Sequence, residues 1–243
     1  MIVLLTDFGE SEYVGMMKGV IYSICEDVRL VDLTHSITPQ SVVEGAWVLK
    51  RSYRFFPPRT IFLAVVDPGV GTERRPVVVK TKHYHFVGPD NGLLYPAASE
   101  DGIEQVFSIK VRKDASRTFH GRDVFAPMAA YLYKGGAGRM LGPYVEGLSI
   151  KLDFHLRGRQ GQIVRVDHFG NVVTNIPPLD KDIYRLNIRG VERAVHWYPT
   201  YAEAPFGDVF LVTGSAGTLE ISLRNGSAAN RISVSPGDIV TID

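Results

Sequence analysis

The chain has 243 residues, which is enough for one large domain or two smaller ones. Its 27 Lys and Arg residues balance 26 Asp and Glu residues, which excludes the basic surplus typical of nucleic-acid binding. One cysteine excludes a disulfide within the chain, and no apolar run approaches the roughly 20 residues of a membrane-spanning helix. We therefore expect a cytoplasmic protein with neither a nucleic-acid nor a membrane partner.

Strand and helix patterns alternate over the first half of the chain. Apolar runs predict strands, and apolar residues spaced three or four apart predict helices. In chain order we expect a strand at 2–6, a helix at 13–25, a strand at 28–33, a helix at 42–55, a strand at 60–66, paired strands at 76–81 and 83–87, a strand at 105–109 and a helix at 123–133. This alternation predicts an α/β N-terminal domain with a largely parallel sheet flanked by helices.

The pattern changes in the second half, where glycines first interrupt the helical spacing. Beyond Gly161, short apolar runs separated by Gly, Pro and Asn turns predict strands at 162–166, 172–176, 208–213, 219–223 and 238–242. These strands favour an all-β second domain, either a sandwich or a small barrel. We expect the α/β domain at 1–150, the β domain at 160–243 and the linker region at 135–160.

Four of the predicted strands of the first half end in or near an acid or an amide. These residues are Asp7, Asp32, Asp67 and the pair Asp90–Asn91. In an open α/β sheet, ligands bind outside the carboxyl ends of the strands, which favours a cleft lined by these side chains. The alternative is that each side chain caps a helix or a turn.

Two loops of the first half add residues suited to catalysis. The loop after the predicted strand 60–66 is long enough to fold Arg74 back beside Asp67. That pairing would keep the carboxylate ionised and place a cation beside a bound water or anion. The alternative is a solvent-exposed arginine. His120 opens the last helix and is either a general base, a ligand or a half-buried structural histidine.

The loops of the second half carry weaker signals. Asp167 and Asn171 flank Gly170 in a strand–turn–strand segment, which turn chemistry alone explains. The loops 214–217 and 225–229 are built of small residues that would admit a flat ring. Phe206 lies between a proline and a glycine, where an aromatic side chain is better placed to stack on a ligand than to join a core.

An ordered set of motifs spans nearly the whole chain. It comprises Thr6-Asp7-Phe8-Gly9, Asp32-Leu33-Thr34-His35, Val66-Asp67-Pro68-Gly69-Val70-Gly71, Gly88-Pro89-Asp90-Asn91-Gly92, Phe119-His120-Gly121-Arg122-Asp123, Asp167-His168-Phe169-Gly170-Asn171, Leu219-Glu220-Ile221 and Gly226-Ser227-Ala228-Ala229. In these motifs the chain resembles the S-adenosyl-L-methionine (SAM) hydroxide adenosyltransferases, or SAM hydrolases. They are related to the SAM-dependent fluorinase and chlorinase.

The resemblance implies hydrolysis of SAM to adenosine and L-methionine by an enzyme with an α/β domain and a barrel-like β domain. It implies a homotrimer with SAM at the subunit interfaces, and no cofactor, since SAM is the substrate. The implied catalytic residues are Asp67, Arg74 and His120. The implied substrate-binding residues are Asp7 for the ribose diol, Asp167 and Asn171 for the methionine amine, Phe206 for adenine, Ser215 near the methionine end, and Asn91, Glu220 and Ser227.

Three alternatives remain open. The halogenase branch shares these motifs, but it carries a tyrosine at the position of Asp67 and lacks the histidine at position 120, which points away from halide as the nucleophile. A metal-dependent hydrolase would use Asp7, Asp32, Asp67 and His120 as oxygen and nitrogen ligands. A non-catalytic SAM sensor would bind SAM and release it unchanged.

Overall fold

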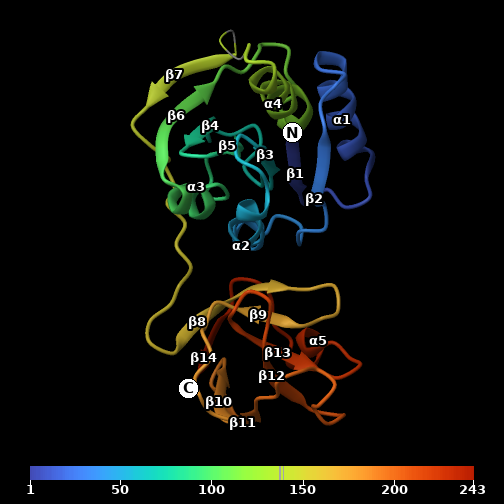
Figure 1. Cartoon of the computed structure of the whole chain (residues 1–243), viewed down its shortest axis with the longest axis vertical. Coiled ribbons are helices and arrows are strands. Elements are labelled where there is room, and N and C mark those ends of the chain that lie inside the picture. Colours follow the sequence, from blue (N-terminus) through green and yellow to red (C-terminus); the bar gives the residue numbers. More distant parts are fainter. Residues whose placement is uncertain (137, 139) are drawn as a thin grey trace. The chain divides into compact units, whose positions relative to one another are not determined.

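A computed structural model of the chain describes residues 1–136, 138 and 140–243. The chain divides into two compact units, Met1–Leu152 and Asp153–Asp243 (Figure 1). Within the described residues, no helix is both long and apolar enough to cross a membrane. Residues 137 and 139, which belong to the expected linker region 135–160, lie outside the described residues.

The first unit is built on a seven-stranded mixed sheet with the strand order β2-β1-β3-β5-β4-β6-β7. The strands are β1 (Ile2–Thr6), β2 (Leu30–Thr34), β3 (Ile61–Val65), β4 (Pro76–Thr81), β5 (His85–Pro89), β6 (Ile103–Ile109) and β7 (Leu141–Val145). Strands β2, β1, β3 and β5 are parallel, whereas β4, β6 and β7 each pair antiparallel to their neighbours. Every residue of β1 and β3 is buried, as expected for parallel strands covered on both faces.

Helices cover both faces of this sheet. They are α1 (Glu12–Ile24), α2 (Val42–Ser52) with a 3₁₀ turn at Tyr53–Phe55, α3 (Tyr95–Asp101), a π turn at Gly121–Phe125 and α4 (Ala126–Tyr133). Leu4 of β1 shares a core cluster with Met17 of α1 and Met128 of α4. Leu5, the next residue of β1, lies instead under Gly45 of α2, and successive strand residues point to opposite faces. The expected α/β architecture is therefore confirmed.

Two elements of the first unit were not predicted. Helix α3 begins Tyr95-Pro96, and a proline in the first turn suits a helix because its missing N–H has no partner there in any case. Strand β7 lies inside the region where we expected the linker, and it adds to the sheet by pairing with β6. Its glycine and proline concealed a strand pattern.

The second unit is an antiparallel barrel-like sheet with the strand order β11-β10-β14-β8-β9-β13-β12. The strands are β8 (Gln160–Val166), β9 (Val172–Thr174), β10 (Ile183–Ile188), β11 (Val191–His196), β12 (Val209–Thr213), β13 (Leu219–Leu223) and β14 (Ile239–Ile242), with the short helix α5 at Ala228–Ile232. A bridge between Trp197, just after β11, and Leu211 of β12 joins the two ends of this order. Of the two architectures left open by the sequence, the barrel is the one observed.

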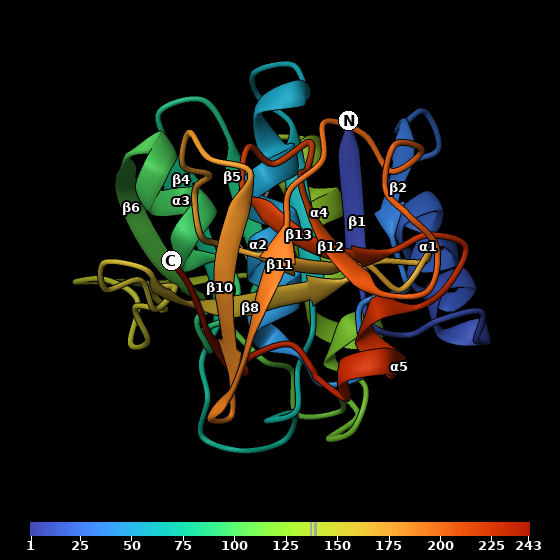
Figure 2. The ribbon, with the colours of Figure 1, turned by 90° about the horizontal axis from the view of Figure 1, so that it is seen from below.

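The hairpin of β10 and β11, which Figure 2 shows as two adjacent strands, was not predicted. Its two turn residues, Arg189 and Gly190, have φ angles of 52° and 82°, as the tight hairpin turn between right-twisted strands requires. Exposed polar residues of this hairpin separate its apolar residues, which therefore form no continuous run.

Candidate active site

A cavity of about 410 Å³ opens at the carboxyl ends of β1 and β3 in the first unit. Asp7, the residue after β1, lines it together with Asp67, which follows β3 by two residues. His120, at the start of the π turn, and Phe119 complete this side of the cavity. The structure thus brings together three of the residues that the sequence singled out, at the sheet edge where ligands bind in this class of fold.

Arg74 folds back onto Asp67, as the loop length predicted. Its Nε donates to Asp67 Oδ1 over 2.8 Å, and its Nη2 donates to Oδ2. The same Nη2 lies 2.9 Å from Nδ1 of His120. Only 9% of the Arg74 side chain and 6% of the Asp67 side chain are exposed, so solvent screens this pair weakly.

The guanidinium group of Arg74 is held on several sides. Its carbon lies 5.3 Å from the ring centroid of Phe125, within the range of a cation–π contact. Its Nη1 is buried and has no hydrogen-bond partner in the part of the chain that the structure describes. Arg74 therefore brings a fixed positive charge, with the two N–H donors of Nη1 still without a partner among the described residues, to the residues that line the cavity.

The protonation of His120 follows from its neighbours. Burial and the positive charge of Arg74 lower the pKa of His120 below its ordinary value of 6.5, so the imidazole is neutral at pH 7. Because a guanidinium group only donates, Nδ1 of His120 must accept the hydrogen bond from Arg74. The proton of the neutral ring then resides on Nε2, which makes Nε2 a donor.

Asp7 is positioned by the turn after β1. Its Oδ2 accepts a hydrogen bond from the main-chain N–H of Gln40 over 2.8 Å. Gly9 has a φ of +61°, so the turn bends back where a side chain would be strained. Both Asp7 and Gln40 line the cavity.

Asp32 does not take part in the cavity. It lies on β2, where its carboxylate contacts Lys18 Nζ at 2.6 Å and His35 Nε2 at 3.0 Å. The expectation that all four strand-end acids line one cleft is therefore wrong for Asp32. Strand β2 is one of the two edge strands of the sheet, and its acid is paired with Lys18 of helix α1 instead.

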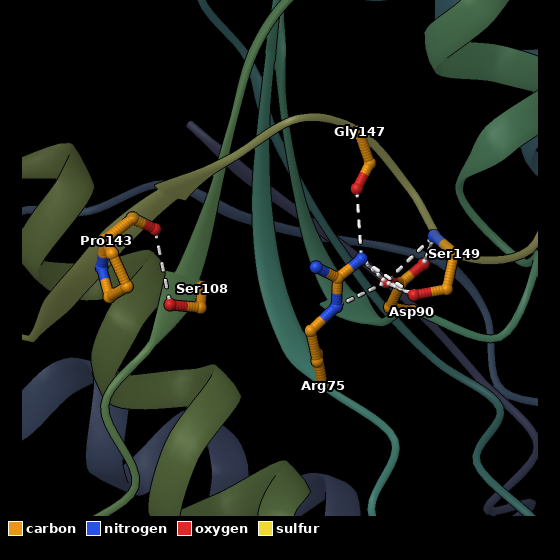
Figure 3. Close-up of polar contacts among 6 residues, drawn as sticks. All are labelled: Arg75, Asp90, Ser108, Pro143, Gly147 and Ser149. Atoms are coloured by element: carbon orange, nitrogen blue, oxygen red, sulfur yellow. Dashed lines mark hydrogen bonds and ion pairs between the residues drawn. The ribbon is translucent and has the colours of Figure 1, made fainter.

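Asp90 and Asn91 also support the structure from outside the cavity. Arg75 Nη2 donates to Asp90 Oδ2 over 2.6 Å, and the Ser149 hydroxyl donates to the same oxygen over 2.8 Å (Figure 3). Asn91 donates from Nδ2 to the carbonyl oxygen of Val66, the residue before Asp67, over 2.9 Å. Asn91 therefore fixes the main chain beside Asp67.

The second unit has a separate cavity of about 840 Å³. Asp167, Asn171 and Ser227 line it, as the sequence suggested for a ligand site. Asp167 Oδ1 accepts from the main-chain N–H groups of Phe169 and Asn171, and its Oδ2 accepts from Asn171 Nδ2, each over 2.8–2.9 Å. These bonds fix the carboxylate in the turn while leaving further lone pairs for a ligand.

Glu220 is paired with a tyrosine that sequence reasoning missed. Tyr201 Oη donates to Glu220 Oε2 over 2.8 Å, and Tyr201 lines the same cavity as Asp167. Burial raises the pKa of Glu220, and the negative charge of Asp167 raises it further. The carboxylate occupies the space where a side chain at position 214 would stand, so glycine is required there: a Cβ would lie 1.7 Å from Glu220 Oε1. No spacing rule in the sequence links Tyr201 to Glu220.

Phe206 and Ser215 lie outside the set of residues that line this cavity. The Phe206 side chain is 64% exposed, and the guanidinium carbon of Arg224 stands 4.1 Å from its ring centroid. Phe206 is thus an exposed aromatic side chain in a loop, as expected. A second exposed aromatic side chain, Phe169, lines the cavity itself.

Metal ligation by the acids named above finds no support in their arrangement. Asp32 faces Lys18, and both Asp67 and His120 face Arg74. Throughout residues 1–136, 138 and 140–243, no three or more His, Cys, Asp and Glu side chains are grouped so that they could hold a metal ion.

Comparison with known proteins gives the same family for both units. Residues 2–142 match the SAM hydroxide adenosyltransferase N-terminal domain, and residues 161–241 match the C-terminal domain of that family. A protein of Salinispora arenicola named (R)-S-adenosyl-L-methionine hydrolase is 35% identical, over 96% of this chain and 94% of its own. A fluorinase of an Actinoplanes species is 28% identical, over 99% of this chain and 96% of its own. The crystal structure of an uncharacterized conserved protein from Thermotoga maritima superposes with a TM-score of 0.89 at 37% identity and covers all of both chains.

Proposed function

The chain belongs to the SAM hydroxide adenosyltransferase family, and we propose that the cavity of its first unit is where water attacks the substrate. The protein hydrolyses SAM to adenosine and L-methionine. The observation that carries the site assignment is the group formed by Asp67, Arg74 and His120 beside this cavity. It combines a carboxylate, a fixed cation and a neutral imidazole, which are the groups needed to orient a water molecule and favour its deprotonation.

The reaction needs help at the nucleophile and none at the leaving group. A new bond forms between the water oxygen and ribose C5′, the C5′–S bond breaks, and its electron pair stays on sulfur. Methionine departs as a neutral thioether without a proton, so no general acid is required. One proton passes from the water to the Asp67 carboxylate, and holding that water in line with the C–S bond supplies much of the rate.

Each residue of the group has a distinct task in this scheme. Asp67 accepts a hydrogen bond from the water with a lone pair not used by Arg74. The positive charge of Arg74 stabilises the hydroxide that develops. His120, protonated on Nε2, donates to the water oxygen and so directs it. A positioned general base such as Asp67 contributes roughly 10²–10⁴-fold to a rate.

The remaining predicted residues form the binding part of the proposal. We assign Asp7 to the two ribose hydroxyl groups, Asp167 and Asn171 to the methionine amine, and Phe206 to the adenine ring. Ser215, Glu220 and Ser227 complete the proposed contacts. Asn91 acts indirectly, through its bond to Val66.

The proposed contacts come from both units of the chain, and we propose that they meet across subunits of a closed homotrimer. A head-to-tail contact repeated around a ring places the first unit of one subunit against the second unit of the next. Mixing Asp67→Asn and Asp167→Ala chains, unfolded together and refolded, should then restore part of the activity. If each chain closed its own site, mixing would restore none.

The alternatives have weaker support. The fluorinase relative is 28% identical, against 35% for the hydrolase relative, and Asp67 and His120 are both present here. A metal-dependent hydrolase would lose activity after exhaustive chelation. A sensor would bind SAM without turnover. The balanced charge and the single cysteine favour a cytoplasmic location for the reaction.

The deciding experiment is incubation of the purified protein with SAM in ¹⁸O-water. Each sulfonium epimer should be tested separately, because the hydrolase relative is named for the R form. We expect adenosine carrying one ¹⁸O at the 5′-hydroxyl, together with unlabelled L-methionine, before and after chelation. A halogenated deoxyadenosine in chloride or fluoride buffer as the main product, or S-adenosylhomocysteine, would refute the assignment.

A further inference from the structure

A chain of polar contacts joins the turn that carries Asp7 to Thr6, His35, Asp32 and Lys18, none of which lines the cavity. The main-chain N–H of Phe8 donates to Thr6 Oγ1 over 3.2 Å, and Thr6 Oγ1 lies 2.9 Å from Nδ1 of His35. The other ring nitrogen of His35, Nε2, lies 3.0 Å from Asp32 Oδ1, and Lys18 Nζ contacts the second oxygen of Asp32 at 2.6 Å. The contacts run from the turn that carries Asp7 to the surface of helix α1.

With a neutral His35 ring, the donors and acceptors of this chain fit one arrangement. A carboxylate accepts only, so Asp32 favours a proton on Nε2 of His35; the contact is electrostatic, since its angle is not that of a straight hydrogen bond. Nδ1 of His35 is then an acceptor, and the Thr6 hydroxyl donates to it while accepting from Phe8 N–H. Thr6 is fully buried, so no water can replace either bond.

His35 also holds the far side of the same turn. Its main-chain carbonyl oxygen accepts a hydrogen bond from Gly9 N–H over 2.7 Å. The turn Thr6–Gly9 is therefore attached to His35 at both ends, by the side chain at Thr6 and by the main chain at Gly9. Asp7 lies between these two attachments, and its own carboxylate bonds to a main-chain N–H at Gln40.

We propose that Thr6 and His35 are positioning residues for substrate binding: they hold the Asp7 carboxylate in the orientation that receives the ribose hydroxyl groups. This inference rests on the proposed assignment of Asp7 to the ribose. A carboxylate that accepts from two hydroxyl groups at once depends on its angle, so loosening the turn weakens ribose recognition. The water-attack group at Asp67 is held by its own hydrogen bonds among Asp67, Arg74 and His120, so we expect the chemical step to change little.

The test compares adenosine with 2′,3′-dideoxyadenosine, which lacks both hydroxyl groups. Thr6→Val removes the hydroxyl and keeps the shape, whereas Thr6→Ser keeps the hydroxyl. We expect Thr6→Val to weaken adenosine binding about tenfold and dideoxyadenosine binding less than twofold, as measured by calorimetry. Thr6→Ser should restore most of the affinity. For SAM, Thr6→Val should raise KM and change kcat little.

Two substitutions of His35 separate its contacts. In His35→Asn the amide reaches the position of Nδ1 and can accept from Thr6, whereas in His35→Gln it reaches the position of Nε2 and faces Asp32. We expect the asparagine variant to bind adenosine several-fold more tightly than the glutamine variant. The matched control is Thr34→Val, because Thr34 Oγ1 accepts from Ser36 N–H over 3.1 Å in a similar turn that does not include Asp7.

Asp7→Asn separates failure of this inference from failure of the proposed function. If Asp7→Asn weakens adenosine selectively while Thr6→Val and both His35 variants bind as the parent does, the positioning role is refuted and the ribose assignment stands. Equal loss for both nucleosides in Thr6→Val would mean a structural role only, and it also refutes the proposal. If Asp7→Asn does not discriminate between the nucleosides, the ribose assignment itself is wrong. Should Thr6→Val fail to fold, the His35 pair decides.

Discussion

Arg74 holds Asp67 through two hydrogen bonds, with Nε donating to one carboxylate oxygen and Nη2 to the other. This two-point contact fixes both the position and the rotation of the carboxylate plane. Since both side chains are almost fully buried, the geometry is established before any substrate arrives. Orientation of the nucleophile then requires no rearrangement of this pair during the reaction.

The first prediction concerns Asp67→Asn. The amide keeps the shape but loses the negative charge and the second acceptor, so kcat should fall by about 10²–10⁴-fold with little change in KM. Steady-state kinetics with SAM measures both. The matched control is Asp114→Asn, which removes a similar two-point pair with Arg112 on the surface and should leave kcat unchanged. A parental kcat in Asp67→Asn would refute the role given to this carboxylate.

The second prediction concerns the pH dependence of the reaction. Burial, with the charge of Arg74, lowers the pKa of His120 below 6.5, so the neutral ring predominates at pH 7 and is lost only on acidification. We expect kcat/KM to be level near neutrality and to fall with an acid limb centred below pH 6.5. His120→Gln should remove this limb, whereas His83→Gln, on an exposed histidine paired with Asp101, should retain it. An acid limb that survives in His120→Gln would contradict the assignment.

The third prediction concerns stability at Glu220. Burial raises the pKa of Glu220, so the folded protein holds this proton more tightly than the unfolded chain does. Stability contributed by the protonated form is therefore present below the ordinary pKa of 4.5 and is lost as the pH rises through the raised value. Glu220→Gln should raise the melting temperature at pH 8 more than at pH 5, because the amide still accepts from Tyr201. Equal shifts at both pH values would contradict the buried-charge explanation.

The fourth prediction concerns the contacts of Asp90, whose side chain is 1% exposed. Asp90→Asn should lower the free energy of unfolding by about 1–3 kcal/mol, since it weakens the bonds from Arg75 and Ser149. Urea unfolding measures the change. Hydrogen exchange should also become faster at the main-chain N–H of Ser149, which donates to Asp90 over 2.9 Å. Ser149→Ala removes only the hydroxyl group, with its bonds to Asp90 and Arg75, and should have a smaller effect. Unchanged protection of residue 149 in Asp90→Asn would refute the link.

Much of the fold could be predicted because its buried strands are continuous apolar runs. Strand β1 was predicted with its observed bounds, and β3 within one residue at each end. Because Asp7 and Asp67 come just after these neighbouring strands, the sequence also predicts that the two residues lie close together. Strand β7 was not predicted because its glycine and proline mask the pattern that buried strands show. The β10–β11 hairpin was not predicted because exposed polar residues interrupt its apolar ones.

The individual contacts of the site could not be derived in the same way. Asp32 and Asp7 both follow or end predicted strands, yet only Asp7 lines the cavity, because β2 is an edge strand and its acid meets Lys18 from α1. Tyr201 reaches Glu220 from a loop 19 residues away. Such contacts depend on side-chain packing, which produces no regular spacing of residue types along the sequence.

Pro143 in β7 has a consequence for solubility. Strand β7 lies at the outer position of the first sheet, where an unpaired edge invites strands of other molecules to add to it. Pro143 has no N–H to offer a further strand, while its carbonyl oxygen accepts from the Ser108 hydroxyl over 3.3 Å (Figure 3). The second sheet has its two ends joined at Trp197 and Leu211. The proline thus opposes edge-to-edge aggregation at the β7 edge of the first sheet, whose other edge is β2. In the second unit, the bridge between the barrel ends has the same effect.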